Sequence, residues 1–195
     1  TPVFVMSALA FQHSEMVKEI IIAAPEEECS RYEKMARNFG VDKLKTVVSG
    51  GITRFLSVKN ALEQVSKECT HIAIHDGARP LISIEDINKM VEASKKCDLA
   101  FLGAHLVDSI KDKEFNNLIR EDYILAYTPQ YVKKNDYLKA YDKASKAYSD
   151  DVTLVYEELG IKPSLVLGDT SNIKITNVSD YLTVAKNINK YRIGH

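Results

Sequence analysis

The 195-residue chain lacks any long apolar run and any marked excess of charge of one sign. No stretch approaches the roughly 20 consecutive apolar residues that a membrane span requires, and the first residues contain no charged segment leading into an apolar one. The chain carries 26 Lys and Arg against 27 Asp and Glu, a net charge of −1. Nonspecific binding to nucleic acid or to an anionic membrane is therefore not expected, and any anion site must be local.

Cysteine is also scarce. Cys29, Cys69 and Cys97 are an odd number at wide spacing without a C-x-x-C pair, which argues against a disulfide framework and against a cysteine zinc site. We therefore expect a reducing, cytoplasmic location. Repeats, linkers and low-complexity segments are absent, and 45% of the residues are apolar, so we expect one globular domain over residues 1–195.

Strands and helices are expected to alternate, which is the pattern of a parallel sheet covered by helices on both faces. The β-branched run Ile20–Ala24, closed by Pro25, is typical of a strand buried on both faces. Further strands are expected at 45–48, 71–75, 99–107, 123–127, 164–167 and 173–175. Helices are expected at 3–11, 26–39, around 55–65, after a Ser83 cap, and at 133–145, 150–159 and 180–191, the last one capped by Ser179.

Residues 108–122 break this alternation. The segment is polar and charged around 116–117 and has short apolar stretches on either side, which predicts a protruding β-hairpin. The expected fold class is therefore α/β, a doubly wound and mostly parallel sheet with an inserted hairpin arm at 108–122.

Ligands bind beyond the carboxyl ends of the strands in an open parallel sheet, so the residues that follow each strand are candidates. The first candidate is Gly50 and Gly51, followed by Arg54 and Ser57 at the start of a helix. Glycines allow close approach of the backbone to a ligand, and a helix N-terminus offers free N–H groups to oxygen atoms. A tight strand-to-helix turn without a ligand explains the same pattern.

The second candidate is the sharp loop at 75–80, which carries Asp76, Gly77 and Arg79. A carboxylate suits Mg²⁺ and a guanidinium suits a phosphate, so this pair at a strand end favours a metal-bound polyphosphate over a structural cap. We interpret His75 as structural, because no Ser or Cys nucleophile pairs with it in the sequence.

The third candidate is the segment 172–176. Strand alternation would place Asn172, Lys174 and Thr176 on one face, with an ammonium between two hydrogen-bonding neighbours. A solvated lysine on an edge strand is, by itself, the better explanation. The acidic turn at 148–151 is likewise slightly better explained as a helix cap than as part of a site.

Taken together, five segments resemble those of one family. The segments are G-G-x-x-R-x-x-S-V-x-N-A-L at 50–62, H-D-G-A-R-P at 75–80, T-P-Q at 128–130, S-D-D at 149–151 and N-I-K-I-T at 172–176. Their order and spacing resemble the 2-C-methyl-D-erythritol 4-phosphate cytidylyltransferases, which have a nucleotide-diphospho-sugar transferase-like fold. The family's first strand and glycine-rich loop have no counterpart here, so we expect residues 1–195 to form the nucleotidyltransferase domain without them.

The resemblance implies transfer of a cytidylyl group from CTP to 2-C-methyl-D-erythritol 4-phosphate, with Mg²⁺ as cofactor. It also implies a homodimer in which the arm at 108–122 reaches the neighbour's site. The implied nucleotide-binding residues are Gly50, Gly51, Arg54, Ser57, Asp76 and Gly77. The implied residues for the sugar-alcohol phosphate are Asp76, Arg79, Ser109, Arg120, Thr128 and Lys174, with Asp76 as metal ligand and with Lys174 and Asp76 as catalytic residues.

Two other functions stay open at this point. Ribitol 5-phosphate cytidylyltransferase shares the loop motifs and the fold, although Arg54, Asp108 and Ser109 in their contexts look more like the methylerythritol enzymes. A non-catalytic nucleotide-binding or receiver-like module would use Asp76 as a modified residue. Receivers are shorter, however, and they need an acidic pair near their first strand, which this sequence does not have.

Overall fold

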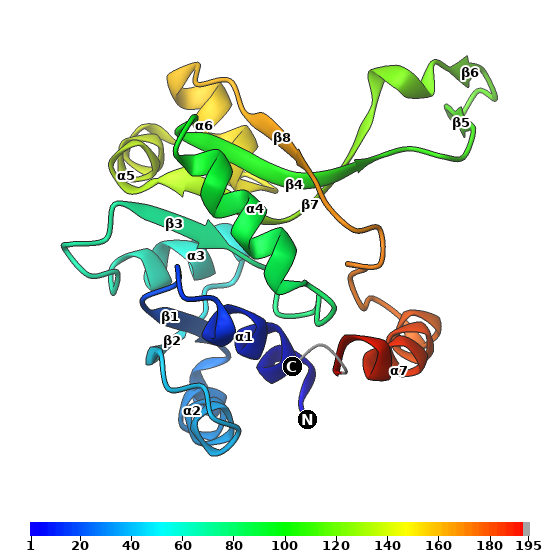
Figure 1. Cartoon of the computed structure of the whole chain (residues 1–195). Coiled ribbons are helices and arrows are strands. Elements are labelled where there is room, and N and C mark those ends of the chain that lie inside the picture. The colour runs from blue at the N-terminus through cyan, green and yellow to red at the C-terminus, as the bar shows by residue number, and fades with distance from the viewer. Residues whose placement is uncertain (193–195) are drawn as a thin grey trace.

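The computed structural model describes residues 1–192, with side chains described through residue 188. Helices and strands alternate along the chain, as expected (Figure 1). The helices are α1 (Val3–His13), α2 (Cys29–Asn38), α3 (Arg54–Leu62), α4 (Ile84–Ser94), α5 (Lys134–Lys143), α6 (Asp151–Leu159) and α7 (Val178–Arg192), with 3-10 turns at Glu26–Glu28 and Arg120–Asp122. The strands are β1 (Ile20–Ala24), β2 (Leu44–Ser49), β3 (His71–Ile74), β4 (Leu99–His105), β5 (Ile110–Lys111), β6 (Asn117–Leu118), β7 (Ile124–Lys133) and β8 (Ser164–Leu167).

Main-chain pairing places β1 and β2 in a parallel two-stranded sheet and forms a second sheet in the order β3-β7-β4-β8. In the second sheet β4 is parallel to β8, whereas β7 is antiparallel to both β3 and β4. Three of its four strands therefore share one direction, which confirms the expected α/β fold with mostly parallel strands. The direction of β7 is reversed because the chain leaves β4 into the arm and returns from the same end.

Helices cover both faces of the larger sheet, which is the doubly wound arrangement. Neighbouring residues of one strand face opposite sides, so Leu99 joins a cluster with α5 and α6, while Ala100 joins a cluster with α4. The first cluster centres on Val132, Tyr137 and Val155. The second contains Ile82, Ile87, Met90, Leu102 and Tyr131, and a third joins α1 and α2 to β2 through Val5, Ala36 and Leu44.

Three local expectations are wrong. β1 is only partly buried, with Ala23 exposed, because β2 is its one strand partner among the described residues. Residues 173–175 form no strand; they cross the end of the sheet toward the 75–80 loop, where the Ile175 N–H donates to the Ala78 carbonyl at 2.9 Å. Ser179 lies inside α7, and the cap is Asn177, whose Oδ1 accepts the Asp180 N–H at 3.0 Å.

The expected hairpin arm is confirmed. β5 pairs antiparallel with β6, Ile110 opposite Leu118, and Figure 1 shows these strands at the tip of an arm that projects from the ends of β4 and β7. The arm side chains Val107, Phe115 and Ile119 are 79%, 81% and 66% exposed. These apolar groups therefore do not pack on the body of their own chain.

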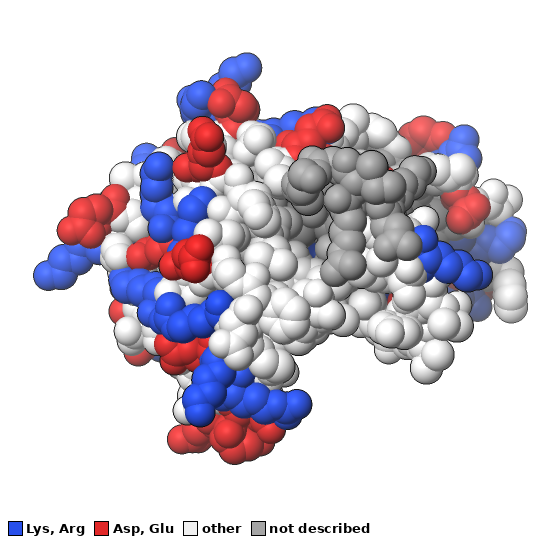
Figure 2. Space-filling view, turned by 60° about the horizontal axis from the view of Figure 1, so that its bottom comes forward, with Lys and Arg blue, Asp and Glu red and all other residues white. Residues whose placement is uncertain are grey.

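The surface agrees with the balanced charge of the sequence. On the face shown in Figure 2, Lys and Arg lie beside Asp and Glu around an uncharged centre, so no large patch of one sign forms there. None of the helices in the described part of the chain combines the length and apolar character that crossing a membrane needs.

Candidate active site

The turn between β2 and α3 is held together by its own hydrogen bonds. The Gly51 N–H donates to Ser57 Oγ at 3.0 Å, and the Ser57 hydroxyl donates to the Thr53 carbonyl at 2.9 Å. A Cβ on Gly51 would lie 2.3 Å from the Cβ of Leu56, so this position admits only glycine. The Gly50 N–H donates to the Ala24 carbonyl at 2.7 Å, which fixes the turn on β1. The Ser57 hydroxyl is thus engaged within the turn itself.

Three cations surround the carboxylate of Asp76, which lies just beyond β3 with its side chain 16% exposed. Lys174 Nζ lies 3.1 Å from Oδ2, Arg79 Nε lies 3.5 Å from Oδ2, and Arg54 Nε lies 3.5 Å from Oδ1. Burial alone would raise the pKa of Asp76, but the hydrogen bond and charge of Lys174 and the charges of the two arginines lower it. Asp76 is therefore an ionised carboxylate in a cationic setting.

His75 and Thr128 fix the main chain at Asp76. His75 Nε2 lies 3.1 Å from the Arg79 carbonyl, and Nδ1 lies 3.1 Å from Thr128 Oγ1. Burial lowers the pKa of His75 to about 4, so the ring is neutral near pH 7, with the proton assigned to Nε2 by its carbonyl acceptor. The Thr128 hydroxyl then donates to Nδ1 and accepts the Asp76 N–H at 3.1 Å.

This arrangement favours the structural interpretation of His75. It also gives Thr128 a different task from the substrate contact that the family resemblance implies. Thr128 is only 5% exposed, and its hydroxyl oxygen holds the main chain of Asp76 by accepting its N–H. The sequence offered no sign of this contact, because 52 positions separate the two residues.

Asn172 is the buried connection between Arg79 and the sheet. Its main-chain carbonyl accepts a hydrogen bond from Arg79 NH1 at 2.8 Å, and its side-chain Nδ2 donates to the main-chain carbonyl of Thr128 at 2.9 Å. Asn172 has no exposed surface, whereas the side chain of Lys174 is 44% exposed, and no strand forms here that would place the two on one face by alternation. The expected strand is therefore the wrong basis for relating Asn172 to Lys174.

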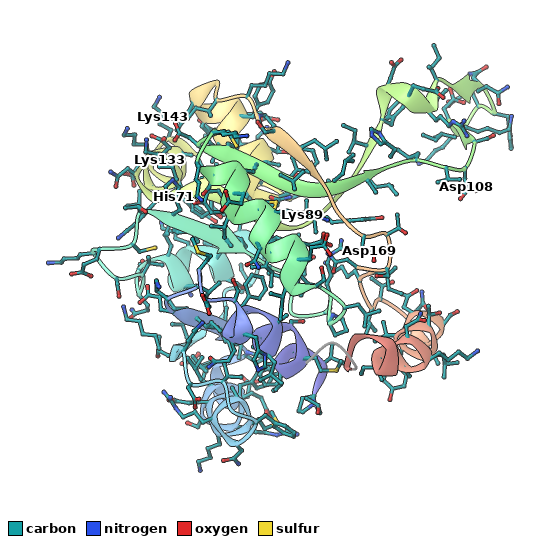
Figure 3. The ribbon with its side chains drawn as sticks, viewed as in Figure 1. His71, Lys89, Asp108, Lys133, Lys143 and Asp169 are labelled. Atoms are coloured by element: carbon teal, nitrogen blue, oxygen red, sulfur yellow. The ribbon has the colours of Figure 1, made fainter. Side chains whose placement is uncertain are left out.

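The segment that carries Lys174 is also tied to α4. Asp86, buried at 2% exposure, accepts the Asp169 N–H through Oδ2 at 3.0 Å. Figure 3 shows the labelled Asp169 near the labelled Lys89 of α4. The hydrogen bonds of Asp169 and Asn172 together fix the main chain before Lys174, whose side chain extends to Asp76.

Arg54 makes a second ion pair that the sequence analysis missed. Arg54 NH2 lies 2.6 Å from Asp151 Oδ2, and NH1 lies 3.2 Å from Oδ1. The cap expected in this acidic turn is provided by Asp150, which accepts the Thr153 N–H at 2.9 Å. The sequence did contain a signal for this ion pair: one of the two carboxylates at 150–151 is enough to cap the helix, so the other was free for a different role.

The arm residues lie apart from this cluster. Ser109 and Arg120 line an open hollow of about 320 Å³ on the arm itself. Arg120 NH1 donates to the Val107 carbonyl at 2.6 Å, and Arg120 Nε pairs with Glu121 at 3.1 Å. Figure 3 labels Asp108 on the arm, and Figure 1 shows that the arm projects away from the body of the molecule. The structure therefore brings together all the predicted site residues except Ser109 and Arg120.

A second open hollow, of about 490 Å³, adjoins the 75–80 loop. Gly77 and Ala78 form one wall, and residues of α1 and α2, including Phe4 and Tyr32, form the other. A Cβ on Gly77 would meet only the ordinary contact of Phe4 Cβ at 3.5 Å. Within the described residues, no three acidic, His or Cys side chains form a group that could hold a metal ion by themselves. A cation at Asp76 would therefore need further oxygen atoms from a ligand.

Comparisons with known proteins show the family to which the chain belongs. The family model described as 2-C-methyl-D-erythritol 4-phosphate cytidylyltransferase matches residues 1–190. The protein of that name from Caldanaerobacter subterraneus subsp. tengcongensis is 39% identical over 194 residues, covering 95% of this chain and 85% of its own length. The one from Dehalococcoides mccartyi strain CBDB1 is 32% identical over 186 residues, covering 93% and 81%.

Solved structures show the same fold. The 4-diphosphocytidyl-2C-methyl-D-erythritol synthase of Anaerococcus prevotii superposes with a TM-score of 0.87 at 22% identity, over 97% of this chain and 86% of that one. The 2-C-methyl-D-erythritol 4-phosphate cytidylyltransferase of Thermus thermophilus superposes with a TM-score of 0.78 at 25% identity, over 94% and 87%. By sequence and by fold, this chain belongs to the 2-C-methyl-D-erythritol 4-phosphate cytidylyltransferase family.

Proposed function

We propose that the protein transfers the cytidylyl group of CTP to 2-C-methyl-D-erythritol 4-phosphate and releases pyrophosphate. The observation that carries this proposal is the convergence of Lys174, Arg79 and Arg54 on Asp76 beyond the end of β3. Phosphate oxygens are strong acceptors for ammonium and guanidinium groups, so the Lys174 ammonium and the Arg79 guanidinium can supply counter-charges for anionic substrates. The family membership supports the identity of both substrates.

The reaction needs positioning and charge neutralisation more than proton transfer. An oxygen of the methylerythritol phosphate attacks the α-phosphorus of CTP, and the bond to the bridging oxygen breaks with its electron pair leaving on pyrophosphate. The nucleophile is already anionic, so no general base is required. This agrees with a His75 ring that is neutral and fully committed to Arg79 and Thr128. Lys174 would neutralise the charge that grows at the α-phosphate.

Mg²⁺ at Asp76 is part of the proposal. One carboxylate together with substrate phosphates is a common way to hold Mg²⁺ in nucleotide enzymes, and Asp76 is ionised and lies at the sheet edge. The ion would neutralise part of the triphosphate charge. The Gly50, Gly51 and Ser57 turn and the Gly77 backbone would lie against the nucleotide, and Arg79 would bind the sugar-alcohol phosphate.

The proposal also includes a homodimer and a cytoplasmic location. Ser109 and Arg120 are grouped on a projecting arm whose exposed apolar side chains would be covered by a second copy of the chain. Cys29, Cys69 and Cys97 are all free thiols, which suits a reducing compartment.

Substrate choice tests the proposed reaction. We expect CTP to be used far better than UTP or GTP with Mg²⁺ present, because a site that hydrogen-bonds one base leaves polar groups unpaired with another. We also expect methylerythritol phosphate to be preferred to ribitol 5-phosphate. Pyrophosphate release measures both comparisons. Equal turnover with UTP would contradict the nucleotide assignment, and preference for ribitol 5-phosphate would support the alternative acceptor.

A further inference from the structure

The ion pair between Arg54 and Asp151 adjoins Asp76, which Arg54 also contacts, and it takes no part in the steps proposed above. We infer that Asp151 is a positioning residue for the reaction: it fixes the guanidinium of Arg54, and Arg54 in turn fixes the side chain of Asp76. This inference rests on the proposed function, because it gives Asp151 its effect through Asp76. It replaces the direct nucleotide contact that the family resemblance implies for Arg54.

Asp151 is held from three elements. It is the first residue of α6 and is 2% exposed, and both of its carboxylate oxygens face Arg54 of α3. The hydroxyl of Tyr137, on α5, donates to Oδ1. The Asp151 N–H donates to Oε1 of Gln130, on β7, at 2.7 Å. A carboxylate with this many partners has one orientation, so it can set the orientation of Arg54.

The planar guanidinium carries that orientation to Asp76. With NH1 and NH2 both bound to Asp151, the remaining Nε of Arg54 lies 3.5 Å from Asp76 Oδ1. A lysine offers one compact ammonium and could not hold both carboxylates in this way. Arg54 therefore acts as a rigid bridge between a buried carboxylate and the one at the reaction centre.

The charges explain why the bridge matters. Burial lowers the pKa of Arg54, but the hydrogen bonds and charge of Asp151 raise it by more, so the guanidinium stays cationic. Asp151 also limits how close Arg54 comes to Asp76. Without Asp151, the same guanidinium could turn both N–H groups onto Asp76 and compete there with Mg²⁺ and Lys174. The pair thus leaves Asp76 available to other cations.

Asp151→Asn tests the inference, because it keeps the size of the side chain and removes its charge. We expect kcat/KM for cytidylyl transfer to fall by about 10-fold or more, the usual effect of removing a group that orients a metal-binding residue. The matched control is Asp150→Asn on the same turn, where asparagine still caps α6 and the rate should change by less than about 2-fold. Wild-type kinetics in Asp151→Asn would overturn the inference.

A double-mutant cycle separates positioning from mere structural support. If Asp151 acts through Asp76, then Asp151→Asn should change the rate by less than about 3-fold in an Asp76→Asn background. Asp151 and Asp76 share no direct contact, so a purely structural Asp151 would give the same loss in both backgrounds, which would refute the inference. Arg54→Lys, at a side chain that is 31% exposed, serves if Asp151→Asn does not fold, and it should show the same loss and the same non-additivity.

Binding of CTP distinguishes failure of this inference from failure of the proposed function. Titration calorimetry with CTP and Mg²⁺ measures binding even where no turnover occurs. Wild-type protein that binds CTP without transferring its cytidylyl group to either sugar-alcohol phosphate would refute the proposed function alone. In that case, weaker CTP binding by Asp151→Asn would still support the positioning role. Equal CTP affinity of wild type and Asp151→Asn, with equal rates, would refute the positioning role alone. Wild-type protein that neither binds CTP nor turns over would overturn both.

Discussion

Among single residues, Lys174 and Arg79 contact the same oxygen of Asp76 but are held very differently. The Arg79 side chain is 12% exposed, donates to the Asn172 carbonyl and lies over the Tyr127 ring, 5.2 Å from its centroid. Lys174 is 44% exposed and reaches Asp76 through its ammonium at 3.1 Å. A half-exposed ion pair adds little stability, so a phosphate can take over the Lys174 ammonium at small cost.

Removal of Lys174 should therefore affect catalysis and spare the fold. We expect Lys174→Ala to lower kcat by about 100-fold or more, as loss of a contact made in the transition state typically does. The thermal midpoint should hardly move. Lys162→Ala, at an exposed lysine between α6 and β8, is the matched control and should keep the wild-type rate. Steady-state kinetics with a near-normal kcat for Lys174→Ala would contradict the catalytic assignment.

The neutral His75 ring predicts a specific pH dependence of stability. Its pKa is about 4 in the fold against 6.5 for an ordinary histidine, so the unfolded chain binds the extra proton first. The free energy of unfolding that this neutral ring contributes is present above the unfolded pKa of 6.5 and is lost as the pH falls toward 4. Between pH 7 and pH 5 this group should remove about 2 kcal/mol from the free energy of unfolding. Urea unfolding of wild type and His75→Gln checks this, since the variant should lose clearly less over that interval.

Among the elements, those with strong local signals could be predicted from the sequence. Apolar spacing and caps located the helices, and apolar runs located most strands, although the strand expected at 123–127 continues to Lys133 in β7. The direction of β7, the irregular course of 173–175 and the Asn177 cap could not be predicted, because each depends on which segment lies alongside in the folded chain. Thr128 and Asp76, for instance, meet across 52 positions of sequence.

The candidate site was predictable to a similar extent. Strand ends identified Asp76 and Arg79, whereas Lys174 was assigned only through the family resemblance, and the structure groups the three residues. The roles of hydroxyl groups were not predictable, because the direction of a hydroxyl is set by its partners. Ser57 is engaged within its own turn, and the Arg54 pair with Asp151 spans 97 positions.

The pairing of β4 with its neighbours β7 and β8 leaves no room for a side chain at Gly103. A Cβ on Gly103 would lie 2.6 Å from the Leu125 carbonyl oxygen and 2.8 Å from a methyl of Leu165, and backbone cannot move aside cheaply. We therefore expect Gly103→Ala to reduce the free energy of unfolding by about 1–3 kcal/mol, the usual cost of overpacking. Gly77→Ala, which meets only an ordinary contact, should leave it nearly unchanged. Equal stability of both variants in urea would contradict this interpretation of Gly103.

For the whole molecule, the main feature is that the predicted binding residues lie in two places. Lys174 lies with Asp76 at the end of the sheet, whereas Ser109 and Arg120 lie on the arm that projects from the body (Figure 1). One chain alone does not bring them together. A twofold dimer that exchanges arms would complete two composite sites, each with Lys174 from one subunit and Arg120 from the other.

Complementation between two inactive variants tests this exchange. Arg120→Ala and Lys174→Ala homodimers should each be nearly inactive. In a heterodimer, one site receives both changes and the other receives neither. Random mixing gives about half heterodimers, each with one intact site of two, so activity should recover to roughly a quarter of wild type. The two variants are refolded together or coexpressed, and the heterodimer that is then purified with two tags, having one intact site of two, should reach about half of wild type. No recovery in a verified heterodimer would mean that Arg120 acts in its own subunit or has no role in the reaction.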